Sequence, residues 1–231
     1  MRIGIIGPSE EEIMPFIGKI THTKTESYAL LTFHCGTYQD VEVIALYCGV
    51  CKVNAAIATQ ILKDIFRVSH IILTGVAGGI DSNLKIGDTV ISTEIAHHDV
   101  ADDILTDYHP WLNSIYFKAD SQLVEFCQQM VNNNHFNQHL FFGRIVTDEA
   151  FITDEGREKI INNHHPLCVD METASVAHVC YANNIPFIAI RSITDTENES
   201  GQEVFEVNCE KAALNSLAIV EKLLDKLKEL V

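Results

Sequence analysis

The stretch from Val169 to Asp195, VDMETASVAHVCYANNIPFIAIRSITD, constrains the fold more than any other part of the chain. Its apolar residues first recur at helical spacing, which predicts a helix over 172–183. Asn184 and Pro186 then end the helix, because the residue before a proline favours extended backbone. The continuous apolar run Phe187–Ile190 follows, and such a run predicts a strand buried on both faces. The stretch is therefore expected to form a helix followed by a buried strand, as in α/β folds.

Two carboxylates mark the ends of this helix–strand unit. Glu172 opens the helix, and Asp195 lies beyond the strand in a polar segment that begins at Arg191. Ligands usually bind at the carboxyl ends of strands in open α/β sheets, so Asp195 is a candidate for chemistry. Both residues also have a structural interpretation, because a glutamate in a first helical turn suits the helix dipole and an aspartate after a strand often forms a cap or a turn. The segment alone leaves both alternatives open.

Composition limits the classes of function. The chain has 231 residues and a formal net charge of −16, from 32 acidic and 16 basic residues. This length predicts one α/β domain over 1–231. The negative charge argues against binding to nucleic acid or to anionic membranes, because both attract positively charged surfaces. No apolar run approaches the roughly 20 residues of a membrane span, and a strand predicted from Arg2 leaves no room for a signal peptide.

The seven cysteines are odd in number and scattered, which favours a reducing cytoplasm over a disulfide framework. Cys48 and Cys51 match the C-x-x-C pattern of redox proteins, but Cys48 ends a predicted strand instead of opening a helix. His97 and His98 are adjacent, and neighbours on a strand face opposite sides, so a metal site is not predicted.

The remaining apolar patterns predict the other elements. Strands are expected at 2–6, 28–33, 41–46, 70–73, 89–95 and 140–146, and helices after Ser9, after Lys52, at 121–131 and at 205–231. A polar segment over 102–114 is expected to be a surface loop. The glycine-rich run over 74–79 would let backbone approach a ligand or another strand closely. The order of elements predicts a single-domain, three-layer α/β/α fold with a central mixed, mostly parallel sheet flanked by helices.

Three glutamates follow the first predicted strand. Ser9 and Glu12 fit a capping box, which is a structural explanation for Glu12. The functional alternative is that Glu10, Glu11 and Glu12 cluster where the carboxyl end of a strand meets the start of a helix. Helix starts in this position often bind anions, but these carboxylates would repel a phosphate. The sequence therefore argues against a phosphate site at this helix start.

Taken together, the motifs resemble those of the 5′-methylthioadenosine/S-adenosylhomocysteine nucleosidases, which have a nucleoside phosphorylase-like fold. The matching segments cover nearly the whole chain and are IGIIGPSEEE, GVCK, TGVAGG, LKIGDTVIS, HHD, FKAD, EAFI, VDMETASVAHVC and RSITD. The resemblance implies a hydrolase that cleaves the N-glycosidic bond of both nucleosides to adenine and a 5-thioribose product, through an oxocarbenium-like transition state. It also implies a homodimer in which each active site takes residues from the partner. No metal or cofactor is expected.

The resemblance assigns roles to the candidate residues. Asp195 is expected to protonate N7 of the leaving adenine, and Glu12 to activate a water on the opposite face of the sugar. Glu172 is expected to accept hydrogen bonds from the ribose hydroxyls. Phe151 is expected to stack with adenine, whose Watson–Crick edge contacts the backbone of Ile152.

Other positions complete the expected substrate pocket. Met171 is expected to pack on the ribose, Phe205 to close the pocket, and Arg191 to orient the water and Glu12. The remaining expected pocket residues are Val50, Val76 and Gly78.

The chain departs from the family pattern at a few positions. Val76 stands where many members have serine, Cys51 replaces a usual glycine, and Asp102 lies near the expected pocket for the 5′ group. An aminofutalosine hydrolase or a 5′-deoxyadenosine nucleosidase would use the same acid and base on a different 5′ group, so these alternatives stay open. A nonenzymatic purine-binding protein is a further alternative, although the presence of all three carboxylates argues against it.

Overall fold

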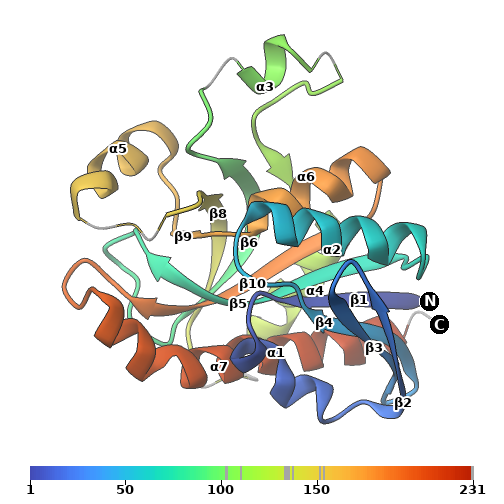
Figure 1. Cartoon of the computed structure of the whole chain (residues 1–231). Coiled ribbons are helices and arrows are strands. Elements are labelled where there is room, and N and C mark those ends of the chain that lie inside the picture. Colours follow the sequence, from blue (N-terminus) through green and yellow to red (C-terminus); the bar gives the residue numbers. More distant parts are fainter. Residues whose placement is uncertain are drawn as a thin grey trace.

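The computed structural model describes residues 1–101, 104–109, 111–132, 136, 138–150, 152 and 154–229. Strands and helices alternate along the chain (Figure 1). In chain order they are β1 (Arg2–Gly7), α1 (Glu10–Ile17), β2 (Thr21–Tyr28), β3 (Leu31–Tyr38), β4 (Val41–Tyr47), α2 (Lys52–Asp64), β5 (His70–Gly79), β6 (Thr89–His97), α3 (Ile104–Asp107), β7 (Phe117–Lys118), α4 (Ser121–Asn132), β8 (Leu140–Thr147), α5 (Asp154–His164), β9 (Cys168–Asp170), α6 (Thr173–Asn183), β10 (Phe187–Asp195) and α7 (Gln202–Lys228).

The strands form one mixed sheet. Its order is β10-β6-β8-β9-β5-β1-β4-β3-β2, and β7 pairs with β6. The central pairings of β1 with β4, β1 with β5, β5 with β10 and β6 with β8 are parallel, whereas β10 with β6 and the β2–β3–β4 meander are antiparallel. Because β10 pairs with both β5 and β6, the sheet curls until five of its strands form a closed ring. The predicted α/β fold with a mixed sheet and flanking helices is confirmed.

Helices cover both faces of the sheet. Figure 1 shows α1 and α7 on one side and α2 and α6 on the other. The side chains of α1, α4 and α7 share one buried apolar cluster with strand residues such as Ile5 and Ile188, and those of α2 and α6 share another that includes Leu73 and Ala189. Apolar residues thus point from the central strands to both faces, which explains the continuous apolar runs in the sequence. Among the described helices, none is both long and apolar enough to cross a membrane.

Two segments that the sequence places after strands are parts of the strands themselves. β5 continues through the glycine-rich run to Gly79, and β10 continues to Asp195. All nine residues of β10 are buried, including Arg191 and Asp195. Polar residues are tolerated inside these strands because they bond to one another across the sheet, a tertiary effect that the local pattern does not contain.

The strand predicted at 28–33 is confirmed only from Leu31, where β3 begins, because Tyr28 ends β2 and a hairpin turn lies between them. β2 and β3 are antiparallel, with Tyr28 opposite Leu31, and the two residues between them have positive φ angles of 48° at Ala29 and 66° at Leu30. β2 has the sequence THTKTESY and seven of its eight residues are exposed, so it has no apolar alternation that could predict it.

Candidate active site

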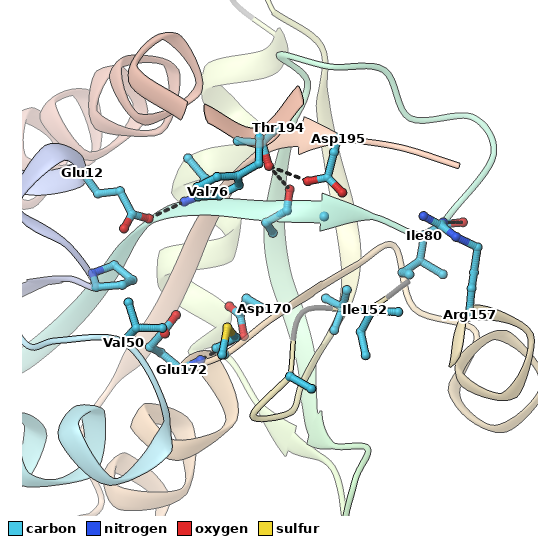
Figure 2. A pocket seen from close by; sticks show the side chains of 17 residues that line it. Glu12, Val50, Val76, Ile80, Ile152, Arg157, Asp170, Glu172, Thr194 and Asp195 are labelled. Carbon is cyan, nitrogen blue, oxygen red and sulfur yellow. Dashed lines mark hydrogen bonds between the residues drawn. The ribbon is translucent and has the colours of Figure 1, made fainter. Parts of the chain in front are cut away.

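A pocket of about 680 Å³, partly open to solvent, lies where β1, β5 and β10 end (Figure 2). These strands are parallel to one another, so their carboxyl ends lie at the same edge of the sheet. The pocket residues are Pro8, Glu12, Val50, Val76, Ala77, Gly78, Ile80, Ala150, Ile152, Arg157, Val169, Asp170, Met171, Glu172, Thr194, Asp195 and Phe205. Most of the sequence-predicted site residues therefore line one cavity.

Two of the predicted residues are not in this lining. Arg191 is fully buried behind the carboxylates of the pocket. Phe151 lies outside the described residues, as does Asp102, so their expected contacts with adenine and with the 5′ group stay predictions. Ile152, next to Phe151, does line the cavity.

Glu12 belongs both to a helix cap and to the pocket. Its Oε2 accepts a hydrogen bond from the backbone N–H of Ser9 at 3.0 Å, as in a capping box, and a second one from the Ser9 hydroxyl at 2.7 Å. Its Oε1 accepts a hydrogen bond from the backbone N–H of Val76 in β5 at 2.8 Å. Burial raises the pKa of Glu12, whereas Arg191 and these hydrogen bonds act in the opposite direction. The structural and the functional alternatives for Glu12 are therefore compatible.

Three carboxylates surround the buried guanidinium of Arg191. Its Nε lies 2.8 Å from Asp170 Oδ2, its Nη2 lies 3.0 Å from Glu172 Oε2, and its Nη1 lies 3.8 Å from Glu12 Oε1. Because a guanidinium is planar, its nitrogen atoms hold their carboxylate partners in fixed directions. The sequence predicts that Arg191 orients Glu12, and the ion pair at 3.8 Å is consistent with that role.

Glu172 is held through both of its oxygens. Oε1 accepts a hydrogen bond from the backbone N–H of Cys51 at 3.0 Å, and Oε2 accepts one from Arg191. Burial raises its pKa, the charge of Arg191 opposes that rise, and the charge of Asp170 adds to it. Cys51 and Cys48, the residues of the C-x-x-C match, are both free thiols. The backbone of this turn thus holds the carboxylate that the sequence assigns to ribose binding.

Asp195 lies at the other end of the pocket. Figure 2 shows it and Glu12 on opposite sides, with β5 running between them. Asp195 Oδ1 accepts a hydrogen bond from the hydroxyl of Thr194 at 2.7 Å. Burial raises the pKa of Asp195, while the Thr194 hydrogen bond and the positive charge of Arg157 lower it. A carboxyl group that keeps its proton more readily than an ordinary aspartate is suited to act as an acid.

Sequence reasoning missed several pocket residues. Asp170 lies in the motif VDMET and binds Arg191. The family resemblance assigned roles only to its neighbours Met171 and Glu172. Arg157 lies on α5, whose sequence DEGREKIINNH lacks an apolar stripe, and α5 itself was not predicted. Its Nη1 donates a hydrogen bond to the carbonyl of Gly79 at 2.7 Å. A pattern of single residues gave no sign of either contact.

The adjacent histidines lie away from these carboxylates. His97 ends β6, and its ring contacts the rings of Phe117 and His178 edge-on. His98 Nε2 lies 3.2 Å from Asp148 Oδ2, although the geometry is not that of a hydrogen bond. Among the described residues, no group of three or more His, Cys, Asp or Glu side chains could hold a metal ion.

Gly75 leaves the space in which Glu12 approaches Arg191. A Cβ at this position would lie 2.6 Å from Arg191 Nη1 and even closer to Glu12 Oε1, and the φ angle of Gly75 is 145°. We expect Gly75→Ala to lower the free energy of unfolding by about 1–3 kcal/mol, because the core is overpacked, and to reduce turnover by separating the two groups. Thermal denaturation and steady-state kinetics measure both effects.

Gly18→Ala is the matched control for this prediction. Gly18 has a φ angle of −61°, and a Cβ there would find no atom closer than 3.5 Å. Its effect on stability should stay within about 0.5 kcal/mol. Equal behaviour of the two variants would contradict the argument from space at Gly75.

Three buried carboxyl groups, those of Glu12, Glu172 and Asp195, line one largely apolar cavity. Cleavage of an N-glycosidic bond needs a proton for the leaving base, an activated water on the opposite face of the sugar, and stabilisation of positive charge on the ring between them. Asp195, Glu12 and Glu172, to which the sequence assigns these three functions, all line this one pocket. Environments that separate the tasks of neighbouring carboxylates are typical of acid–base enzymes.

Comparison with known proteins agrees with this chemistry. The sequence profile of the phosphorylase superfamily matches residues 2–225. A 5′-methylthioadenosine/S-adenosylhomocysteine nucleosidase of Maridesulfovibrio salexigens is 37% identical over 98% of this chain and the whole length of the relative. The crystal structure of such a nucleosidase from Colwellia psychrerythraea, in complex with adenine, superposes with a TM-score of 0.90 at 34% identity, over 98% of this chain and 96% of that one.

A futalosine hydrolase of Helicobacter pylori is also similar. It superposes with a TM-score of 0.88 at 27% identity, over 98% of each chain. The matches to the superfamily profile and to the nucleosidases extend over nearly the whole sequence. The chain therefore belongs to the phosphorylase superfamily and, within it, to the family of 5′-methylthioadenosine/S-adenosylhomocysteine nucleosidases.

Proposed function

We propose that this chain hydrolyses the N-glycosidic bond of 5′-methylthioadenosine and S-adenosylhomocysteine, releasing adenine and the corresponding 5-thioribose product. The observation that carries the proposal is the convergence of three buried carboxylates, Glu12, Glu172 and Asp195, on one largely apolar pocket. The names of the relatives that match over the full chain support the choice of substrates.

Asp195 is the proposed general acid. As the bond to adenine breaks, negative charge develops on the purine, and a proton delivered to N7 neutralises it. The raised pKa that burial gives Asp195 keeps a larger fraction of the carboxyl protonated near neutral pH. The hydrogen bond from Thr194 to Oδ1 orients the group and leaves Oδ2 for the purine.

Glu12 is the proposed general base, and Glu172 binds the ribose. Glu12 lies across the pocket from Asp195, where a water could attack the sugar from the face opposite adenine. Glu172 has both oxygens fixed by protein donors, so its remaining lone pairs can accept the ribose hydroxyls in a defined direction. Those hydrogen bonds strengthen as positive charge grows on the ring, which lowers the energy of the transition state.

Water is the proposed nucleophile. Glu10 and Glu11 are exposed at the start of α1, beside buried Glu12, and their charges would repel a phosphate dianion. Arg191 already faces Glu12, Glu172 and Asp170, so its charge is compensated. The proposed steps use only side chains and water.

The identity of the 5′ group is the second question, because a futalosine hydrolase has the same fold. The test compares kcat/KM for 5′-methylthioadenosine, S-adenosylhomocysteine, 5′-deoxyadenosine and aminofutalosine under identical conditions. We expect the two thio-nucleosides to exceed the others by about tenfold or more, the scale on which contacts of a 5′ group in an apolar pocket discriminate. A preference for aminofutalosine or 5′-deoxyadenosine would favour the alternative function with the same acid and base.

The proposed enzyme is a homodimer. An apolar surface, here called the α2–α6 face, consists of the exposed side chains of Val53, Ile57, Trp111 and Tyr181. The hydroxyl of Tyr181 on α6 donates a hydrogen bond to the carbonyl of Trp111, which lies between α3 and β7. Val50, 44% exposed, lines the pocket three residues before Val53. A second copy on this face would cover apolar surface next to the open side of the pocket.

Substitution of Val53 tests the dimer. We expect the wild type to have twice the 25.8 kDa mass of the chain in light scattering, and Val53→Glu to be a monomer with a higher KM, because a buried charge at the interface is unpaired. Leu30→Glu is the control, since Leu30 is fully exposed at the tip of the β2–β3 hairpin. A monomeric wild type, or a Val53→Glu variant that stays dimeric, would contradict the proposed interface.

A cytoplasmic location and a role in methionine salvage complete the proposal. All seven cysteines are free, as expected in a reducing compartment.

A further inference from the structure

Asp170, the last residue of β9, has more polar contacts than a pocket wall requires. It is 6% exposed. Its Oδ1 accepts hydrogen bonds from the hydroxyl of Thr147 at 2.6 Å, from the backbone N–H of Thr173 at 3.1 Å and from that of Glu172 at 3.3 Å. Its Oδ2 accepts a hydrogen bond from the Thr173 hydroxyl and lies 2.8 Å from Arg191 Nε. One carboxylate thus joins three strands and the first turn of a helix.

These contacts determine the position of two groups at the reaction centre. The backbone N–H bonds fix the start of α6, where Glu172 is the N-cap residue. The ion pair of Asp170 with Nε, together with the hydrogen bond that Nε donates to the Thr173 hydroxyl at 3.3 Å, fixes one edge of the Arg191 guanidinium. Because that group is planar, Nη1 and Nη2 are then aimed at Glu12 and Glu172. The proposed base and the ribose-binding carboxylate both depend on this alignment.

We propose that Asp170 is a positioning residue for the nucleosidase reaction, which holds Arg191 and the N-terminus of α6 so that Glu12 and Glu172 face the sugar. The inference rests on the proposed function. Asp170 acts through Arg191 and Glu172, and its role is to set their directions.

The charge of Asp170 gives this role a measurable signature. Titratable and charged groups from four parts of the fold lie around Glu172. They are Arg191 on β10, Asp170 on β9, Glu12 on α1, and Cys48 and Cys51 in the turn before α2. Among these, Asp170 raises the pKa of Glu172 and Arg191 lowers it. With Arg191 Nη2 still paired to Glu172, loss of the negative charge at position 170 should therefore lower the pKa of Glu172. Because Glu172 must be ionised to accept the ribose hydroxyls, the acid limb of the kcat/KM profile should move to lower pH.

The test compares Asp170→Asn with the wild type on whichever nucleoside the wild type hydrolyses fastest. The side-chain carbonyl oxygen of asparagine can still accept hydrogen bonds from the backbone N–H groups of Glu172 and Thr173. Its NH₂ group then points at Arg191 Nε, so that two hydrogen-bond donors face each other. We expect kcat/KM to fall about 10- to 100-fold, the range for loss of one hydrogen bond to a charged group, here the bond from the Thr173 hydroxyl to Oδ2. The acid limb should shift to lower pH, and Asp170→Glu should recover part of the rate because it restores the charge.

Asp120→Asn is the matched control. Asp120 Oδ1 accepts hydrogen bonds from the backbone N–H groups of Gln122 and Leu123, both at 3.0 Å, at the start of α4. It therefore makes the same kind of cap, and no arginine among the described residues pairs with it. The rate and the pH profile of Asp120→Asn should equal those of the wild type.

Four outcomes separate the possibilities. A fall in rate with a shifted acid limb, partly reversed in Asp170→Glu, supports the positioning role. A rate within about twofold of the wild type, or a loss of rate with an unmoved acid limb, overturns it. If Asp170→Asn does not fold, the charge-retaining Asp170→Glu variant decides. Its pH profile should match that of the wild type, and an unreduced rate despite the altered reach of the side chain would overturn the proposal. A wild type that releases no adenine from any nucleoside refutes the proposed function instead.

Discussion

Replacing Glu12 by glutamine is expected to reduce turnover about 10²-fold or more while adenine binding is retained. The carboxylate is the proposed base for the attacking water, and glutamine cannot accept a proton. Some stability should be lost as well, because a single amide oxygen cannot accept hydrogen bonds from both Val76 and Ser9 as the two carboxylate oxygens do. The measurements are single-turnover release of adenine, calorimetric titration with adenine, and thermal denaturation.

Glu11→Gln is the control for this prediction. Glu11 lies in the same helical turn and is exposed, so its substitution removes the same charge without touching the pocket. Its rate should stay within about twofold of the wild type. A Glu12→Gln variant that loses stability but keeps its rate would mean that Glu12 serves only as a helix cap.

Replacing Asp195 by asparagine is the second substitution with a large expected effect. We expect kcat to fall about 10²- to 10⁴-fold for adenine nucleosides, because the leaving group no longer receives a proton. The basic limb of the pH profile should change too. Asp195 donates only while protonated, so wild-type activity should fall as the pH rises through its pKa, which burial raises. In Asp195→Asn this limb should disappear.

A change of leaving group isolates the acid role. A 5-methylthioriboside of 4-nitrophenol releases a stable phenolate that needs no proton, so Asp195→Asn should lose far less rate on it than on 5′-methylthioadenosine. Glu197→Gln, an exposed change two residues further along, is the control and should behave as the wild type on both. Equal losses on both substrates would contradict an acid role for Asp195 and indicate a role in binding.

The sequence predicted the fold class because its strongest patterns are the ones that tertiary packing uses. The run Phe187–Ile190 is buried on both faces of the sheet, and the apolar positions of α6 and α7 contact the two core clusters. Apolar patterns did not predict the strand bounds where polar residues are buried. Arg191 and Asp195 lie inside β10, whereas a local pattern places them in a turn. The burial of Arg191 is possible only because distant residues such as Asp170 and Thr74 supply its partners.

Those site residues that belong to a single recognisable motif could be predicted from the sequence. Glu12, Glu172 and Asp195 each belong to a recognisable segment, and all three line the pocket. Arg157 approaches the pocket from α5, a helix without an apolar stripe, and the closure of the sheet by the β5–β10 pairing has no local signal. Contacts between segments more than a hundred residues apart, such as Cys51 with Glu172, depend on the assembled fold.

The most direct test of the account is release of adenine from 5′-methylthioadenosine in phosphate-free buffer, with identification of the sugar product. The three carboxylates and the acidic start of α1 predict full activity without phosphate, free methylthioribose as the product, and no increase in rate when phosphate is added. Release that requires phosphate and yields the sugar 1-phosphate would contradict the account, because the nucleophile would then be an anion that Glu10, Glu11 and Glu12 should repel.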